Sequence, residues 1–478
     1  MRNRILAGVV AVGLAVAMSA CSDITSINKN PNGPTDVAPP AILSGVIQGI
    51  VGSGGYGVDG VNSLNVRGAG LFVQYYSEIQ YRDEDRYILR EVDGGWGAYA
   101  GALEDAQRMI SKGMDQGVPN WDAVGRIMKS YMFSVMTDAM GDIPYSEALK
   151  GDSVLHPKYD SQQSIYTALF ADLKTASDEI APAGIGFSSG DLMYGGDMSE
   201  WKKFANSLRL RLAMHLTNVD AATAQSEAQA AIAAGVFDSN DDNAQLMYLA
   251  SPPNQNPIYN NAKSRDDYGM SQTYVDSLLS WNDPRLPVFA QPNANGDYEG
   301  LQNGLLGGPP LSEISRIGAL WRETPDAPLA LLTYSEVLFL EAEAAERGWT
   351  NGDPAALYNA AITASMEQYG IDAADIATYL AQARVTYAGG QAGLDQIAYQ
   401  KWASMFMQGM EAWTEWRRTG VPVLVPGPDA TLSAPPQRLP YATNEASLNK
   451  ANLDAAVAAQ GFGDYTALDV PLWFTGNQ

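Results

Sequence analysis

Helical periodicity is the feature that most narrows the folds open to this chain of 478 residues. Beyond residue 96, apolar side chains recur three or four positions apart, the spacing that lines up one face of a helix. Strand-like alternation is scarce, and strands do not alternate with helices as they do in Rossmann or TIM-barrel proteins. The sequence therefore predicts a mainly α fold. Its expected helices cover residues 99–110, 121–139, 165–180, 201–212, 220–234, 334–347, 353–370, 373–383 and 393–416.

Start and stop signals bound several of these helices. Asp353 followed by Pro354 is a strong helix start, because Asp caps the first turn and Pro is preorganised for the first helical position. Gly235 is typical of a helix end and closes the helix over 220–234. Pro182 ends the helix over 165–180. Asn120 is a candidate cap for the helix that begins at Trp121.

Several predicted helices form pairs with short joints, at the spacing of helical-hairpin repeats. The tetratricopeptide consensus is not met, so any such repeats are degenerate. Two irregular regions, about 237–268 and 284–328, are longer than ordinary connectors and are expected to be functional or mobile. The sequence thus predicts a helical body over 41–478 with a loop-rich lobe at about 237–328.

Composition excludes several functions. Acidic groups outnumber basic ones by 54 to 30, a net charge of −24, whereas non-specific nucleic-acid binding needs a basic face. His156, His215 and Cys21 are too few for a His/Cys zinc site. The turn at 238–249 resembles the opening of a calcium loop but has Leu249 in place of the bidentate Glu. We therefore expect no metal and no cofactor.

The N-terminus has the pattern of an export signal. Arg2 and Arg4 precede an apolar run that ends at Met18, which is shorter than the ~20 residues of a membrane-spanning helix. Small residues then lead to Cys21, as in a bacterial lipobox. We expect a signal peptide over 1–20, lipidation of Cys21 and a tether over 21–40. The alternative is an ordinary signal peptide with an incidental cysteine.

Motifs from one end of the chain to the other carry a family resemblance. They are Asn30-Pro31-Asn32, Gly195-Gly196-Asp197, the 201–211 segment, Asp283-Pro284-Arg285, Thr333-Tyr334-Ser335-Glu336, the 341–345 segment, Gln400-Lys401-Trp402, Gly409, Glu411-Ala412-Trp413, the 416–420 segment and the 438–441 segment. In this order they make the chain resemble the SusD/RagB outer-membrane lipoproteins, in the SusD-like branch.

The resemblance implies a tetratricopeptide-like scaffold carried by a lipid anchor in the outer membrane and facing the cell exterior. Members of this family sit on a TonB-dependent β-barrel transporter of the SusC type and capture oligosaccharides, or peptides in some branches. They are binding proteins and not enzymes.

An aromatic segment supplies the candidate ligand contacts. Sugars have apolar C–H faces edged by hydroxyls, so they bind flat aromatic platforms beside polar groups. Candidate contacts are Tyr76, Tyr81, Arg82 and Trp96 in this segment, and Tyr268 and Trp321 at the ends of the long loops. We expect Phe72 and Tyr99 to belong to the core instead.

Other interpretations stay open. The ligand could be a peptide, or the aromatic segment could be an interface of a non-nutrient scaffold. A glycosidase would need two converging carboxylates, and Asp83 and Asp85 are too close in sequence to supply them. Trp402, Trp413 and Trp416, with Arg417 and Arg418, are expected to form core packing with a guanidinium network.

Overall fold

The computed structural model describes residues 36–52, 60–89 and 95–476. Pro39–Gln478 form one compact unit, and the fold is that of this unit. The predicted signal peptide, Cys21 and the tether up to residue 35 lie outside the described residues. The tether was expected to end at residue 40, and the first described helix, α3, begins at Pro39.

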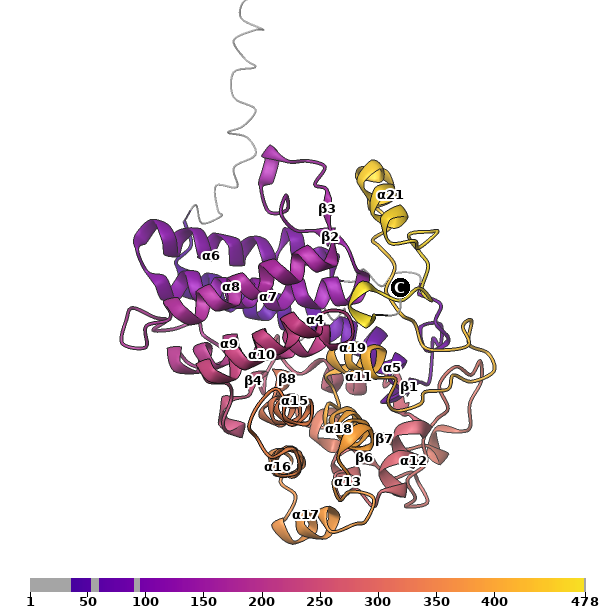
Figure 1. The fold of residues 1–478 in the computed structure, drawn as a ribbon. Helices are drawn as coiled ribbons and strands as arrows, with labels where there is room; N and C mark the ends of the chain where they lie inside the picture. The colour runs from indigo at the N-terminus through magenta and orange to yellow at the C-terminus, as the bar shows by residue number, and fades with distance from the viewer. Residues whose placement is uncertain (1–35, 53–59, 90–94, 477–478) are drawn as a thin grey trace, which may run out of the picture. The chain divides into compact units, whose positions relative to one another are not determined.

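Long helices packed side by side make up the first half of the unit (Figure 1). Gly117 and Val118 alone separate α6 from α7, so these two helices form a tight hairpin. Asn120 does not cap α7; its side-chain amide donates to the carbonyls of Ala181 and Ile185, and Pro119 occupies the first turn. The helices are α3 (Pro39–Val51), α6 (Ala102–Gln116), α7 (Pro119–Met140), α8 (Gln162–Glu179), α9 (Met198–His215) and α10 (Ala221–Ala234).

A second group of helices follows the loop-rich segment. Helix α15 packs against α16, α18 and α9, which joins the two groups. As predicted, Asp353 caps α16 through its side chain, with Pro354 in the first turn. The helices are α15 (Tyr334–Glu346), α16 (Pro354–Gln368), α17 (Ala373–Leu380), α18 (Gly390–Ser404), α19 (Gly409–Thr419), α20 (Glu445–Leu448) and α21 (Lys450–Ala459).

The prediction of a single helix over 393–416 is wrong. The chain forms α18 and α19, separated by residues 405–408, where Met407 has φ 70°. The break lets Gly409 approach the backbone of Gly70, so closely that an added Cβ would lie 2.6 Å from the Gly70 nitrogen. Apolar periodicity runs through the break because the residues on both sides are buried.

The 237–328 segment holds short helices and strands rather than irregular loops alone. One antiparallel sheet has the order β1-β5-β7-β6, and β1 comes from the aromatic segment near the N-terminus. The strands of this sheet are β1 (Tyr76–Glu78), β5 (Tyr268–Met270), β6 (Ala290–Gln291) and β7 (Arg316–Ile317). The helices are α11 (Pro257–Ser264), α12 (Gln272–Ser280), α13 (Leu286–Phe289) and α14 (Ala319–Arg322). The remaining strand pairs are β2 (Ile143–Pro144) with β3 (Tyr159–Asp160), and β4 (Ala244–Leu246) with β8 (Leu329–Leu332).

These elements confirm the prediction of a mainly α fold. The core includes the apolar faces of α7, α9, α15 and α19, together with Phe72 as expected. Within the described ranges, no helix has the length and apolar composition that crossing a bilayer requires.

Candidate binding site

A π-helical turn, η1 (Asn65–Ala69), brings Val66 and Arg67 to the wall of a pocket. The backbone N–H of Gly70 donates to the Asn65 carbonyl, the wide spacing that defines such a turn. The Asn65 side chain also bonds Met407 and Met410 at the start of α19. The break between α18 and α19 therefore holds this turn in place.

Two paired strands form the floor of the same pocket. In the ladder between β1 and β5, Glu78 lies directly opposite Tyr268, and Tyr76 lies opposite Met270. Directly opposed residues in an antiparallel pair share a face and touch. The rings of Tyr76 and Tyr268 meet edge to face, with 5.5 Å between centroids. Glu78 and Tyr268 are thus neighbours at the base of the pocket.

The pocket has a volume of about 130 Å³. Tyr81 stands at its edge and is 71% exposed, a high value for a large aromatic side chain. The Arg265 guanidinium lies 4.7 Å from the centre of the Tyr81 ring, within cation–π range. The lining is Val66, Arg67, Glu78, Gln80, Tyr81, Glu84, Pro257, Ile258, Asn261, Arg265, Asp267 and Tyr268.

Most charges in the pocket are paired. Arg67 donates to Glu84 at 2.8 Å, and Arg265 lies 3.1 Å from Asp267. Glu78 differs, because burial and the nearby charges of Glu84 and Asp85 raise its pKa to about 9. The site therefore combines an exposed aromatic ring, paired charges and an uncharged carboxyl group at neutral pH.

Two of the predicted contacts, Tyr81 and Tyr268, line this pocket. Tyr268 is buried and contributes to the floor. Tyr76 has no exposed surface, and its hydroxyl donates to the Asn65 carbonyl. A ring without exposed surface has no face to offer a sugar, so Tyr76 supports the pocket from behind. This corrects the expectation of direct contact for Tyr76.

Arg82 also lies behind the surface. Its guanidinium donates to the Gly307 carbonyl and lies 4.0 Å from the buried carboxylate of Asp85. Arg82 is 8% exposed and is not part of the pocket lining. The structure therefore gives it a role in holding loops together rather than in direct contact.

Trp96 and Trp321 lie apart from the pocket. Trp96, half-buried in η3 (Trp96–Ala100), packs against Tyr99, Tyr159 and Tyr441. Trp321 is buried and packs against Phe406 beside a cavity of only about 30 Å³. Trp96 therefore retains a surface that a ligand could reach. Trp321 does not, and this corrects the expectation of ligand contact at Trp321.

The polar residues of the pocket were missed by sequence reasoning. Arg265 lies nearly two hundred positions after Arg67 and Glu78, and the pairing of β1 with β5 brings it close to them. No short motif marks them. A usable signal for Arg265 was its position three residues before Tyr268, a predicted contact.

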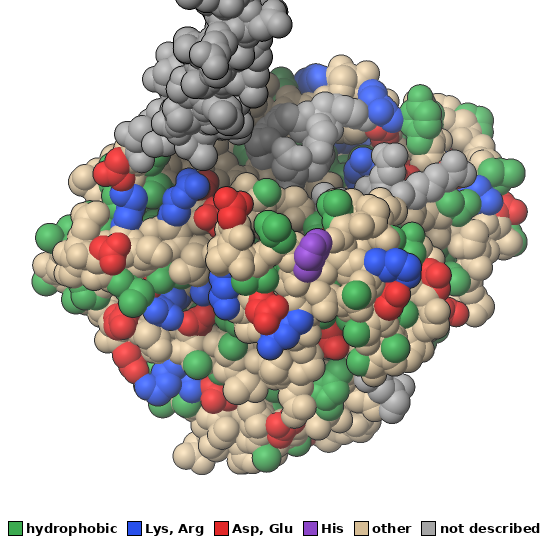
Figure 2. Space-filling model, turned by 90° about the horizontal axis from the view of Figure 1, so that it is seen from above, with side chains coloured by type: hydrophobic (Ala, Val, Ile, Leu, Met, Phe, Trp, Pro, Cys, Tyr) green, Lys and Arg blue, Asp and Glu red, His purple; other side chains and the backbone are tan. Residues whose placement is uncertain are grey.

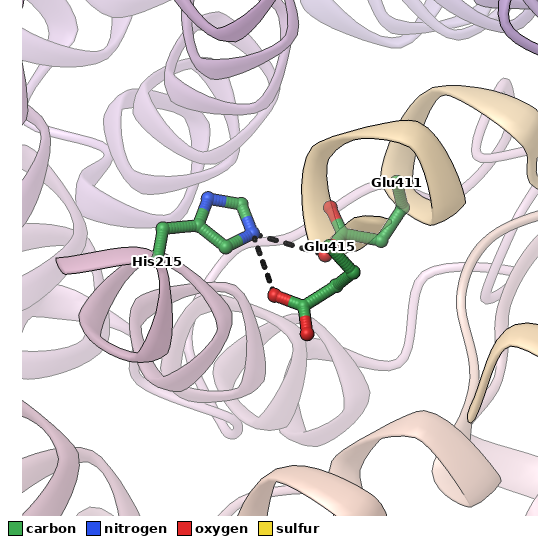
Figure 3. A group of neighbouring side chains, drawn as sticks. All are labelled: His215, Glu411 and Glu415. Atoms are coloured by element: carbon green, nitrogen blue, oxygen red, sulfur yellow. Dashed lines mark hydrogen bonds and ion pairs between the residues drawn. The ribbon is translucent and has the colours of Figure 1, made fainter. Parts of the chain in front are cut away.

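A buried cluster with metal-ligand residue types lies elsewhere, where His215 of α9 faces Glu411 and Glu415 of α19 (Figure 3). His215 Nε2 lies 2.9 Å from Glu411, and Nδ1 lies 3.3 Å from Asp138. Burial alone would lower the His215 pKa, but these carboxylates outweigh it and raise the pKa to about 9. The imidazolium is itself the cation of this cluster.

Other cations complete the same network. They pair the carboxylates of α15 and α19 through Arg211–Glu336 at 2.6 Å, Lys401–Glu415 at 3.1 Å, and Arg418–Glu343 at 2.7 Å. These pairings among the described residues favour a structural role for the cluster. This agrees with the expected guanidinium network around Arg418.

The calcium-like turn is also filled by a side chain. The Lys203 ammonium lies 2.9 Å from Asp242 and 3.3 Å from Asp238. Asp242 accepts backbone hydrogen bonds within a capping box that begins at Ser239. The Lys203 ammonium therefore supplies the positive charge that a bound cation would otherwise supply.

On the face drawn in Figure 2, acidic and basic side chains are interspersed among the described residues.

Comparisons with known proteins agree with this architecture. Residues 31–442 match the SusD-like family model described as starch-binding and associating with the outer membrane. A solved chitin-binding protein is 32% identical, with a TM-score of 0.80 over 92% of this chain and 100% of that one. A chitin-binding SusD homologue from Flavobacterium johnsoniae is 26% identical, with a TM-score of 0.81 over 92% and 99% of the two chains.

A SusD homologue from Bacteroides fragilis is also 26% identical, with a TM-score of 0.80 over 92% of this chain and 100% of that one. None of the curated proteins compared with the chain matches it. The helical fold and these relatives define a class of outer-membrane-associated proteins. The chain belongs to the SusD-like family within that class.

Proposed function

We propose that the protein is a lipid-anchored cell-surface protein that binds oligosaccharides and delivers them to a TonB-dependent transporter of the SusC type. The observation that carries the binding role is the exposed Tyr81 ring, held by Arg265 at the edge of a pocket with polar walls. An aromatic face beside hydrogen-bonding groups is the surface that a sugar ring requires.

The relatives favour a glycan over a peptide as the ligand. Two solved relatives are named as chitin-binding, and one of them shares 32% of its residues with this chain. The family description also names a polysaccharide. A chitin-type oligosaccharide is therefore the first ligand to test, and a peptide the alternative.

The proposed role is non-catalytic. A glycosidase needs one carboxyl group as acid and another as base or nucleophile. In the pocket, Glu84 and Asp267 are held in ion pairs by Arg67 and Arg265, which leaves them poorly placed to act as a base. The names of the relatives likewise describe binding.

Affinity electrophoresis tests the binding role. Residues 22–478, which contain the whole compact unit, are run through native gels that contain chitin derivatives, starch or other polysaccharides. We expect retardation in at least one gel with its polymer intact. Tyr81→Ala should abolish the retardation, while Leu155→Ala, an exposed position outside the pocket, should not. A cleared track, or equal retardation of both variants, would contradict the proposal.

The delivery role needs a separate experiment. The full chain is purified from detergent-solubilised outer membranes, and co-purifying proteins are identified by mass spectrometry. A TonB-dependent barrel should co-purify in a fixed ratio with both the native chain and Tyr81→Ala. If no barrel co-purifies, the binding role stands and the delivery role fails.

The anchor is tested by replacing the predicted lipidation site. Cys21→Ser should move the protein from the outer-membrane fraction to a soluble fraction, because a lipid is then no longer attached. Unchanged fractionation would contradict the predicted lipidation.

A further inference from the structure

Glu78 is a carboxyl group at the base of the pocket without a cation paired to it. Among the described residues it has no ion pair, and its Oε2 accepts a hydrogen bond from the Asp85 backbone N–H at 3.2 Å. Arg67 lines the same pocket but is bonded to Glu84 instead. The side chain is 4% exposed. Burying a lone carboxylate is costly, so the neutral form is favoured.

The surroundings reinforce this preference. Burial raises the pKa of Glu78 most, and the acidic groups of the turn η2 (Glu84–Arg86) raise it further. The positive charge of Arg67 lowers this pKa only weakly. The titratable and charged groups that face Glu78 are Arg67, Tyr76, Arg82, Glu84, Asp85 and Tyr268. With a pKa of about 9, Glu78 keeps its proton at pH 7. A protonated carboxyl group is a hydrogen-bond donor as well as an acceptor.

Apolar residues complete the environment of this donor. Val66, Pro257 and Ile258 line the pocket with Glu78 and Tyr268, and all of them are buried. The volume of about 130 Å³ leaves room for a small substituent of a sugar ring. An acetamido group is such a substituent, and it combines a carbonyl acceptor with a methyl group.

We propose that Glu78 makes the pocket selective for sugars that carry an acetamido group, by donating a hydrogen bond from its carboxyl O–H to the acetamido carbonyl oxygen. The acetamido methyl group then lies against Val66 and Ile258. This inference rests on the proposed function, and it deepens that function by naming a residue that determines specificity.

The pocket should discriminate against related sugars for different reasons. A glucose unit has a hydroxyl in place of the acetamido group, so it leaves the apolar wall uncovered and the donor unsatisfied. A buried donor without a partner costs about 1–3 kcal/mol, which corresponds to roughly tenfold or more in affinity. A glucosamine unit brings an ammonium group, which would require Glu78 to ionise.

Calorimetry with three β-1,4-linked hexamers tests the proposal, using N-acetylglucosamine, glucosamine and glucose units. At pH 7 the wild-type chain should bind the acetylated hexamer roughly tenfold or more tightly than the glucose hexamer. From pH 7 to pH 10 its affinity for the acetylated hexamer should fall about tenfold, because Glu78 ionises. Glu78→Gln keeps a donor that does not titrate, so its affinity should stay nearly constant over this range.

Each outcome decides a different point. Equal wild-type affinity for the acetylated and glucose hexamers, or preference for glucosamine at pH 7, overturns the role of Glu78 but leaves glycan binding intact. An equal loss of affinity in wild type and Glu78→Gln assigns the titration to another group and also overturns it. Binding to no glycan at all overturns the proposed function itself. The hexamer comparison needs only wild-type protein, so it stands even if the variant fails to fold.

Discussion

At the scale of single residues, two buried titratable groups make opposite contributions at neutral pH. His215 carries a charge that Asp138 and Glu411 stabilise. Glu78 keeps its proton because burial and the neighbouring carboxylates raise its pKa. The first is favourable for folding at pH 7, and the second is a cost.

Stability should fall as the pH rises through the range in which His215 loses its proton. The His215 pKa is about 9 in the folded protein and about 6.5 when unfolded. A raised folded-state pKa means that this contribution is complete below pH 6.5 and is lost between pH 6.5 and 9. The expected loss is roughly 3 kcal/mol. Urea unfolding at pH 6 and pH 9.5 measures it.

His156 supplies a matched control for this prediction, because it is an exposed histidine outside the network. His215→Gln should be less stable at pH 6 and should show a smaller decline with pH. His156→Gln should behave like the wild type. A decline in His215→Gln equal to that of the wild type would show that other groups cause it.

Glu78→Gln should stabilise the protein at neutral pH. The carboxyl group is protonated when folded and ionised when unfolded, so stability is lost from about pH 4.5 up to pH 9. At pH 7 this cost is up to about 3 kcal/mol, and an amide avoids it. Thermal unfolding at pH 5 and pH 8 should show a gain that grows with pH. A variant less stable than wild type at pH 8 would contradict this reading of Glu78.

Sequence reasoning could select Tyr81 because an exposed aromatic beside charged turn residues is visible locally. It could not separate Tyr81 from Tyr76, five positions earlier, because burial of Tyr76 depends on β5 and on Asn65. Glu78 was invisible for the same reason. Its environment comes from the nearby turns η1 and η2 and from α11, which is distant from both in the sequence.

At the scale of elements, the contact between η1 and α19 determines both a helix break and the wall of the pocket. The backbones meet at Gly70 and Gly409, where neither residue leaves room for a side chain. The helices α7, α9 and α15 were predictable, because their periodicity is local. The break before α19 was not, because its cause is a contact with a segment more than three hundred residues away in sequence.

Gly409→Ala should destabilise the protein by about 1–3 kcal/mol, the usual cost of overpacking. The new Cβ would lie 2.6 Å from the Gly70 nitrogen, a backbone atom that cannot move freely. The variant should also lose glycan affinity, because η1 carries Val66 and Arg67. Gly307→Ala is the control, since an added Cβ there meets nothing within 4 Å. Chemical denaturation of both variants makes the comparison, and equal stability would refute the close approach.

At the scale of the whole molecule, a continuous set of buried ion pairs connects helices from both halves of the chain. It runs from Asp138 on α7 through His215 on α9 to Glu415 on α19, and on to Glu343 on α15 through Arg418. The end-to-end motifs of the sequence analysis include several of these residues. The overall architecture was therefore predictable, while the pairing of individual charges was not.

Removing one member of this set should be costly. Arg418→Ala leaves Glu343 and Glu415 buried without their shared partner, and we expect a loss of roughly 3–5 kcal/mol. Lys450→Ala breaks only the exposed pair with Asp454 and should cost less than about 1 kcal/mol. Unfolding free energies of the two variants, measured in the same buffer, test this. A similar small effect for both would show that water reaches the buried pair.

The same ion pairs constrain how this sequence can change over time. A conservative apolar replacement can be absorbed by small shifts of its neighbours, but loss of one buried charge leaves its partner unpaired. Arg211 and Glu336, which lie 125 positions apart, can therefore drift only together or through an unstable intermediate. Related chains should replace such residues as sets, and the history of the family should be recorded in correlated substitutions between α9, α15 and α19.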